Sequence, residues 1–120
     1  MWARQLASRV ADIARQHDVP AIVAVPLNRR PDYRHNAHRP MLADLGPWEE
    51  LLAVAEASLA LYRDEYYFKE ESVATGVAEI IVNLNRRGPT STVRVAFDHA
   101  RAWFSQLAGK EDGDGSYRDV

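Results

Sequence analysis

Apolar residues recur at intervals of three or four positions at the start of the chain. The stripe consists of Trp2, Leu6, Val10 and Ile13. Charged residues lie mostly off this stripe, so the spacing predicts an amphipathic helix over residues 2–17 that ends before Pro20. The continuous apolar run AIVAV (21–25) that follows is typical of a strand covered on both faces, as in a parallel sheet.

Residues 26–46 contain many prolines and arginines and few apolar positions. A segment of this length without periodicity is typical of a functional loop, so the sequence predicts a long basic loop here. A second helix is predicted to follow, because Pro47 suits a first helical turn and Glu49 and Glu50 suit the positive end of the helix dipole.

The second half of the sequence reads as strands. The run 58–62 predicts one strand, and the runs 77–84 and 91–97 predict a hairpin whose turn carries Arg-Arg-Gly-Pro. The element order predicts an α/β domain over residues 1–108, with parallel core strands and an antiparallel C-terminal hairpin. Residues 109–120 are acidic and have no apolar periodicity, which predicts a disordered tail.

Composition narrows the class of protein only in part. The 120 residues have room for a single modest core, and the absence of cysteine excludes a disulfide framework and thiolate metal sites. No run approaches the roughly 18 apolar residues that a membrane-spanning helix needs, so we expect a cytoplasmic protein without a membrane partner. The net charge is only −2, but cationic residues are concentrated in one loop. Its cationic residues are Arg29, Arg30, Arg34, His35, His38 and Arg39.

This basic loop has two interpretations. Arginines beside an aromatic residue can follow a nucleic-acid strand, which would make Arg29, Arg30, Arg34 and Arg39 DNA contacts. The loop is equally consistent with a polar, solvated surface segment. Two histidines among so many cations do not indicate a metal site, and we predict none.

Two further patterns bear on nucleotide chemistry. None of the six glycines begins a phosphate-binding loop of the form GxxxxGK[ST], and no Ser-His-Asp arrangement is specific. SLALYRDE (58–65) is similar to the strand ending in Asp-Glu that positions Mg²⁺ and water in phosphate-loop enzymes. Because Arg63 changes the spacing and no phosphate loop accompanies it, solvated charges at an exposed strand end are the simpler expectation.

Taken together, several stretches resemble the C-terminal RecA-like motor domain of the hexameric replicative helicase DnaB. The matching stretches are VPAIVAVPLNR (19–29), RPMLADL (39–45), LYRDEYY (61–67), GVAEIIVNLNRRGP (76–89) and TVRVAF (92–97). The resemblance implies a partial RecA-like, phosphate-loop NTPase sheet from a homohexameric, ATP-dependent enzyme of DNA replication. It also implies that Arg86 is an arginine finger, which reaches the γ-phosphate of ATP bound by a neighbouring subunit.

The departures from the family pattern concern chemistry. The Walker A and Walker B residues that hold ATP and Mg²⁺ belong to a half of the family's domain that this sequence lacks, so we expect no cofactor of its own. The glutamine that senses the γ-phosphate is replaced by Pro26, and the lysine that accompanies the finger by Leu84. The DNA-contacting loop, which reads Asp-Leu-Arg-Glu-Ser-Gly in the family, is Asp-Leu-Gly-Pro-Trp-Glu here, at residues 44–49.

Three hypotheses follow from the match and its departures. The first is a truncated helicase fragment that is no ATPase by itself and supplies Arg86 to a partner, either a DnaB-type ring or the missing N-terminal half. The second is a non-catalytic module, in effect a pseudoenzyme, that binds DNA or a helicase. The third is a non-functional remnant. In each case a truncated sheet would expose apolar surface and strand edges.

Overall fold

The computed structural model describes residues 2–28, 38–69, 72 and 75–107, and the predicted disordered tail lies outside them. The chain forms two compact units, divided between Ser58 and Leu59. Within the described residues no helix is long and apolar enough to cross a membrane. The elements in chain order are α1 (Trp2–His17), η1 (Leu42–Ala53), β1 (Ala57–Tyr62), α3 (Asp64–Phe68), β2 (Val77–Asn85), β3 (Ser91–Asp98) and β4 (Trp103–Ser105).

The N-terminal unit pairs α1 with the 3-10 turns of η1. The buried residues of α1 are Ala3 and Ala7, one turn apart, which lets the helix approach a neighbour closely. Trp2 packs edge to face on Trp48, with ring centroids 4.7 Å apart. The helix predicted over 2–17 is therefore confirmed. Its large apolar residues are not buried, however, and Trp2 and Ile13 are both more than half exposed.

The second predicted helix exists but begins earlier than expected. Residues 42–46, predicted as part of the loop, already belong to η1. The element kinks at Gly46, whose φ of 59° is a left-handed conformation that favours glycine, and Pro47 then opens the later turns. Asp44, fully buried, accepts a hydrogen bond from the Met41 N–H through Oδ2 at 2.7 Å. Its carbonyl oxygen accepts another from the Asn28 N–H at 2.9 Å.

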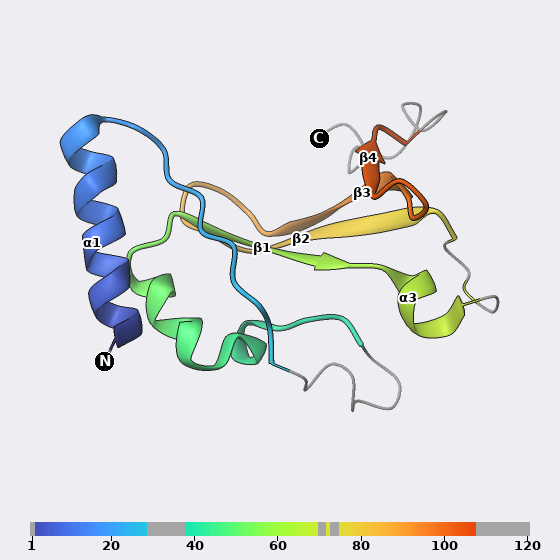
Figure 1. The fold of residues 1–120 in the computed structure, drawn as a ribbon, viewed down its shortest axis with the longest axis horizontal. Coiled ribbons are helices and arrows are strands. Elements are labelled where there is room, and N and C mark those ends of the chain that lie inside the picture. Colours follow the sequence, from blue (N-terminus) through green and yellow to red (C-terminus); the bar gives the residue numbers. More distant parts are fainter. Residues whose placement is uncertain (1, 29–37, 70–71, 73–74, 108–120) are drawn as a thin grey trace. The chain divides into compact units, whose positions relative to one another are not determined.

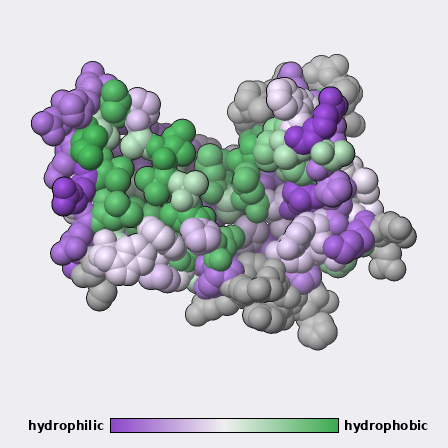
Figure 2. All heavy atoms as spheres, viewed as in Figure 1, coloured by the Kyte–Doolittle hydropathy of each residue, from purple (hydrophilic) through white to green (hydrophobic). Residues whose placement is uncertain are grey.

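The strand predicted over AIVAV does not form in the described chain. Residues 19–28 have no regular structure, and Ile22 is 96% exposed. A central strand of a parallel sheet needs a hydrogen-bonded neighbour on each side. Among the described residues no strand pairs with this run, and all of its residues except the half-buried Val25 are exposed. Figure 2 shows broad apolar areas where the N-terminal unit lies.

The C-terminal unit is built on a sheet of order β1-β2-β3-β4 (Figure 1). β2 and β3 pair antiparallel, from Val77 opposite Ala96 to Val82 opposite Ser91, and β3 pairs antiparallel with β4. The predicted strand over 58–62 and the predicted hairpin are confirmed. The short elements α3 and β4 were not predicted, and the predicted parallel core is not among these two registered pairings.

The core of this unit lies on one face of the hairpin. Its buried residues are Ala78, Val93 and Val95, against which Ile80 and Phe97 pack. These residues share a face because side chains alternate along each strand and the register places Ala78 opposite Val95 and Ile80 opposite Val93. The packed core and the paired strands thus fix the position of the turn that joins β2 to β3.

Candidate functional site

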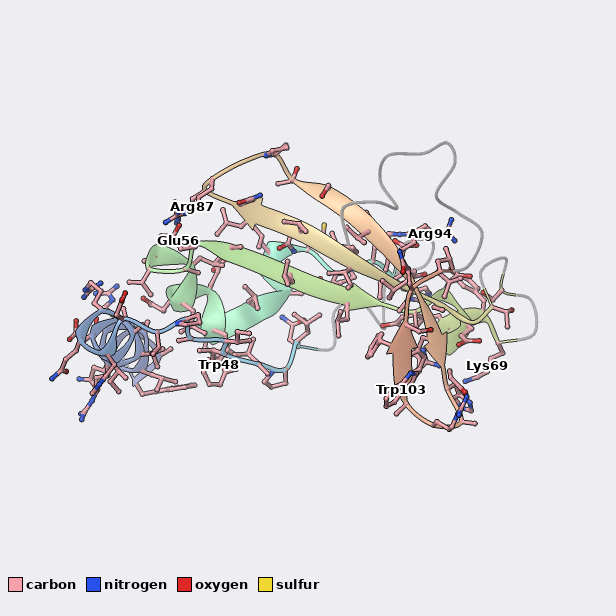
Figure 3. The ribbon with its side chains drawn as sticks, turned by 90° about the horizontal axis from the view of Figure 1, so that it is seen from above. Trp48, Glu56, Lys69, Arg87, Arg94 and Trp103 are labelled. Carbon is pink, nitrogen blue, oxygen red and sulfur yellow. The ribbon has the colours of Figure 1, made fainter. Side chains whose placement is uncertain are left out.

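The turn between β2 and β3 carries the two arginines that the sequence singled out. β2 ends at Asn85 and β3 begins at Ser91, and both Arg86 and Arg87 are exposed. Figure 3 places Arg87 at one end of the sheet and Trp103 at the other. The turn therefore presents guanidinium groups at the tip of the hairpin, where an anion carried by another molecule could reach them.

The side chain of Asn85 braces this turn. Its Oδ1 accepts a hydrogen bond from the Arg87 N–H at 3.1 Å, and its Nδ2 donates one to the Pro89 carbonyl oxygen at 3.2 Å. The first of these bonds is the side-chain-to-backbone contact of an Asx turn. The Asn85 amide lies close to Gly88, where an added Cβ would be 3.4 Å from Nδ2, at ordinary contact distance. Arg86 thus belongs to a turn with its own internal support.

The Tyr-Arg-Asp-Glu motif lies at the end of β1 and forms a second cluster. Asp64 accepts hydrogen bonds from the Tyr62 hydroxyl (2.9 Å) at Oδ1 and from the Ser72 hydroxyl (2.6 Å) at Oδ2. Glu65 accepts one from the Gly76 N–H (3.2 Å) at Oε1 and pairs with the Arg63 guanidinium (3.4 Å) through Oε2. All four carboxylate oxygens are therefore engaged within the chain.

This cluster corrects the expectation of solvated charges at a strand end. The side chains of Arg63 and Glu65 are only 25% and 15% exposed. The Arg63 guanidinium lies 4.5 Å from the centre of the Phe97 ring, a cation–π contact that ties β1 to β3. The Gly76 N–H that binds Glu65 belongs to a residue with φ of 75°, just before β2 begins. The motif is a structural tie between β1, α3 and the start of β2.

The same geometry speaks against Mg²⁺ at this motif. A magnesium site needs carboxylate oxygens that face open, hydrated space. Here the oxygens of Asp64 and Glu65 are already held by four donors of the chain. Among the described residues no cluster of three or more histidine, aspartate or glutamate side chains could hold a metal ion.

The other residues that the sequence singled out do not join either of these clusters in the described part of the chain. Arg29, Arg30, Arg34 and His35 lie outside the described residues, and Arg39 is exposed, so DNA contact by this loop stays a prediction. Pro26, in place of the sensor glutamine, lies in the irregular segment 19–28, and Leu84, in place of the lysine, is half-buried near the end of β2. Asp44, the first residue of the altered DNA loop, is held inside the N-terminal unit.

Two features of this geometry were missed from the sequence, the role of Asn85 in the turn and the contact between Arg63 and Phe97. The role of Asn85 could have been predicted, because an asparagine close before a glycine often accepts a hydrogen bond from the backbone N–H two residues further on. The stack of Arg63 on Phe97 had no such signal, since the two residues are 34 positions apart in the sequence. Only the pairing of the strands brings them together.

Comparison with known proteins gives the same assignment over most of the chain. The family model for the DnaB-like helicase C-terminal domain matches residues 3–106. The replicative DNA helicase DnaB of Pasteurella multocida is 37% identical over 100 residues, which is 83% of this chain and 21% of that protein. The DnaB of Buchnera aphidicola is 35% identical over 99 residues, 82% of this chain and 21% of that protein.

Solved structures agree. A solved ATPase domain matches with a TM-score of 0.80 and 34% identity, covering 88% of this chain and 36% of that chain. A DnaB-like replicative helicase, solved in a study of its interactions with primase, matches with a TM-score of 0.79 and 34% identity, covering 87% of this chain and 25% of that chain. The chain spans about a fifth of the length of the curated relatives. It belongs to the family of DnaB-like helicase C-terminal domains.

Proposed function

We propose that this chain is the arginine-donating part of a DnaB-type helicase motor. In this proposal Arg86 reaches the γ-phosphate of an ATP molecule held by another subunit and stabilises the charge that develops during phosphoryl transfer. The chain itself neither holds the nucleotide nor activates the attacking water. Its contribution is one positioned guanidinium and the sheet that carries it.

The observation that carries this proposal is the braced, exposed turn. A finger must be pre-organised, because a mobile arginine loses side-chain entropy when it meets the phosphate. Arg86 lies between Asn85 and Pro89, whose hydrogen bond closes the turn. The hairpin below is fixed by its register and by the core around Ala78 and Val95.

The engaged carboxylates support the second half of the proposal. Asp64 and Glu65 are the acidic pair that a nucleotide site in this chain would use, and their oxygens already accept hydrogen bonds from Tyr62, Ser72 and Gly76, with Arg63 as the ion-pair partner. The sequence contains no phosphate-binding loop. We therefore expect no ATP hydrolysis by the chain alone.

Several exposed apolar residues indicate that a further part of the motor domain packs against this chain. Ile22 is almost fully exposed, and Leu59 and Leu61 on one face of β1 are 61% and 60% exposed. The matched ATPase domain is nearly three times as long as the part that this chain covers. In our proposal the remainder of such a domain, carried by the same polypeptide or by another, covers these residues and completes a parallel core that includes residues 21–25.

Fragment complementation tests this proposal. The partner is the Pasteurella multocida helicase from which the 100-residue segment aligned with this chain has been removed. We expect this chain to co-elute with it and to restore ATP hydrolysis, and we expect Arg86→Ala to co-elute equally but to lose the restored activity by roughly 1,000-fold or more. Arg87→Ala, on the same turn, is the matched control and should retain most of the activity.

The two readouts separate docking from catalysis. Co-elution with equal activity for the wild type and Arg86→Ala would overturn the role of Arg86. Absence of co-elution would overturn the proposed completion of the domain.

A further inference from the structure

The turn that carries Arg86 is shaped by a side chain rather than by the strand ladder alone. The registered β2–β3 pairs end where Val82 faces Ser91, so residues 83–90 lie beyond the last of them. Within this span Asn85 reaches forward to the backbone of Arg87 and Pro89 through separate atoms of one amide. Both bonds hold backbone groups that follow Arg86 in the chain, while Asn85 itself precedes it.

The amide matches this task in length and chemistry. Oδ1 is an acceptor and faces the Arg87 N–H, whereas Nδ2 is a donor and faces the Pro89 carbonyl oxygen. An aspartate would keep the first bond and lose the second. A glutamine carries one more methylene group and would move both atoms away from the positions that an Asx turn requires. Only asparagine makes both bonds at this position.

We propose that Asn85 is a positioning residue for Arg86, an inference that rests on the proposed function of the turn. By fixing the backbone at Arg87 and Pro89, Asn85 limits the directions in which the Arg86 side chain can leave the turn. The side chain of Asn85 does not touch the phosphate. It acts by reducing the disorder of the guanidinium that does, and misplacement of a catalytic group by about 1 Å is enough to lower a rate on the order of 100-fold.

The test combines an exchange measurement on this chain with a mutant cycle in the complementation assay. In Asn85→Ala we expect the Arg87 amide to lose its protection from hydrogen exchange, and the restored kcat to fall on the order of 100-fold at unchanged KM for ATP. Asn85→Asp, which keeps the bond to the Arg87 N–H, should keep the protection and lose less activity. Asn83→Ala removes an asparagine from the same strand, leaves both turn bonds intact and serves as the control.

The cycle distinguishes positioning from general destabilisation. If Asn85 acts through Arg86, Asn85→Ala will have no further effect on kcat in an Arg86→Ala background. An equal loss in both backgrounds, or full activity of Asn85→Ala beside an inactive Arg86→Ala, would overturn the positioning role alone. Full activity of Arg86→Ala would overturn the proposed function, and the positioning role with it.

Discussion

The two units of this chain differ in how far they bury their large apolar residues. The C-terminal unit buries Tyr62, Val93 and Val95 and keeps an alternating core face along its hairpin. In the described part of the N-terminal unit no large apolar side chain is buried: Ala3 and Ala7 of α1 are buried, while Ile13 and Ile22 are exposed. Contiguous exposed apolar surface marks a site of interaction. The C-terminal unit thus has a packed core of its own, although Leu59 and Leu61 of β1 are also exposed, whereas the described part of the N-terminal unit buries no large apolar side chain.

Their polar groups differ in the same way. The carboxylates of Asp64 and Glu65 are partly buried and accept hydrogen bonds that join three elements. In the N-terminal unit, by contrast, the ion pair of Arg4 with Glu50 involves an arginine side chain that is mostly exposed. Water and salt screen such pairs strongly. We therefore expect the local stability of the two units to differ, with the hairpin the more resistant to opening.

The largest expected effect is at the Asp64 cluster. Asp64→Ala removes the acceptor of the buried Tyr62 hydroxyl and of Ser72, and should destabilise the C-terminal unit by about 2–3 kcal/mol. Asp12→Ala, which removes an exposed ion pair with Arg15, is the control and should cost less than about 1 kcal/mol. Native-state hydrogen exchange of β2 and β3 amides measures the first, and exchange of α1 amides the second. An equal loss of stability in the two variants would contradict the expected difference in local stability between the units.

A matched pair of valine truncations gives the next effect. Val95→Ala removes two buried methyl groups from the hairpin core and should cost about 2 kcal/mol, including the cavity that remains. Val23→Ala makes the same change in the segment 19–28, where the side chain is 41% exposed, and should change stability by less than about 0.5 kcal/mol. Urea titration of both variants compares them. A large cost at Val23 would mean that this segment is packed in the isolated chain.

A smaller effect is expected at the surface of the N-terminal unit. The Arg4 Nε lies 3.1 Å from Glu50 Oε1, but the Arg4 side chain is 74% exposed. Glu50→Ala should therefore destabilise α1 by about 0.5 kcal/mol at low salt, and less at 1 M salt. Thermal unfolding followed by helix circular dichroism at the two ionic strengths measures the difference. A salt-independent loss above about 1 kcal/mol would contradict the assignment of this pair to a solvated surface.

The smallest effect concerns the turn between β3 and β4. The hydrogen bond from the Arg101 guanidinium (2.8 Å) lowers the pKa of Asp98 below its ordinary value of 3.8, assisted by the Ala100 N–H at 3.1 Å. Because the folded pKa is the lower one, this stabilisation is present above the unfolded pKa and disappears as the pH falls through the folded pKa. Carbon-detected NMR titration of the Asp98 carboxyl should give a midpoint below 3.8.

Arg101→Ala is the variant that checks the cause. Without the guanidinium, the midpoint for Asp98 should move back toward 3.8. A midpoint unchanged by this substitution would mean that the Ala100 and Arg101 backbone groups, rather than the guanidinium, hold the carboxylate.

Local patterns in the sequence identified the elements that depend on local chemistry. Alternation located the strand at 58–62 and the hairpin, and helical spacing located α1, because these periodicities are fixed by backbone geometry. The run at 21–25 has the composition of a buried strand, but a strand forms only beside a pairing partner, and no described strand is that partner.

The candidate site was predictable only in part. The exposed position of Arg86 in the hairpin turn followed from the sequence, while its role as an arginine finger stays a prediction. Asn85 could have followed from turn chemistry. The engagement of Asp64 and Glu65 could not be predicted, because it depends on Ser72 and Gly76, which only the fold brings close. The placement of Glu79 opposite Arg94 likewise appears only once the register of β2 and β3 is known.

The most direct test of the whole account is hydrogen exchange of residues 19–28 and β1, measured in the chain alone and after mixing with the helicase that lacks the aligned segment. We predict fast exchange of residues 19–28 in the isolated chain and strong protection of both segments in the mixture, with β2 and β3 protected equally in both samples. Exchange of residues 19–28 at the same fast rate in both samples would contradict the claim that the rest of an ATPase domain covers this unit.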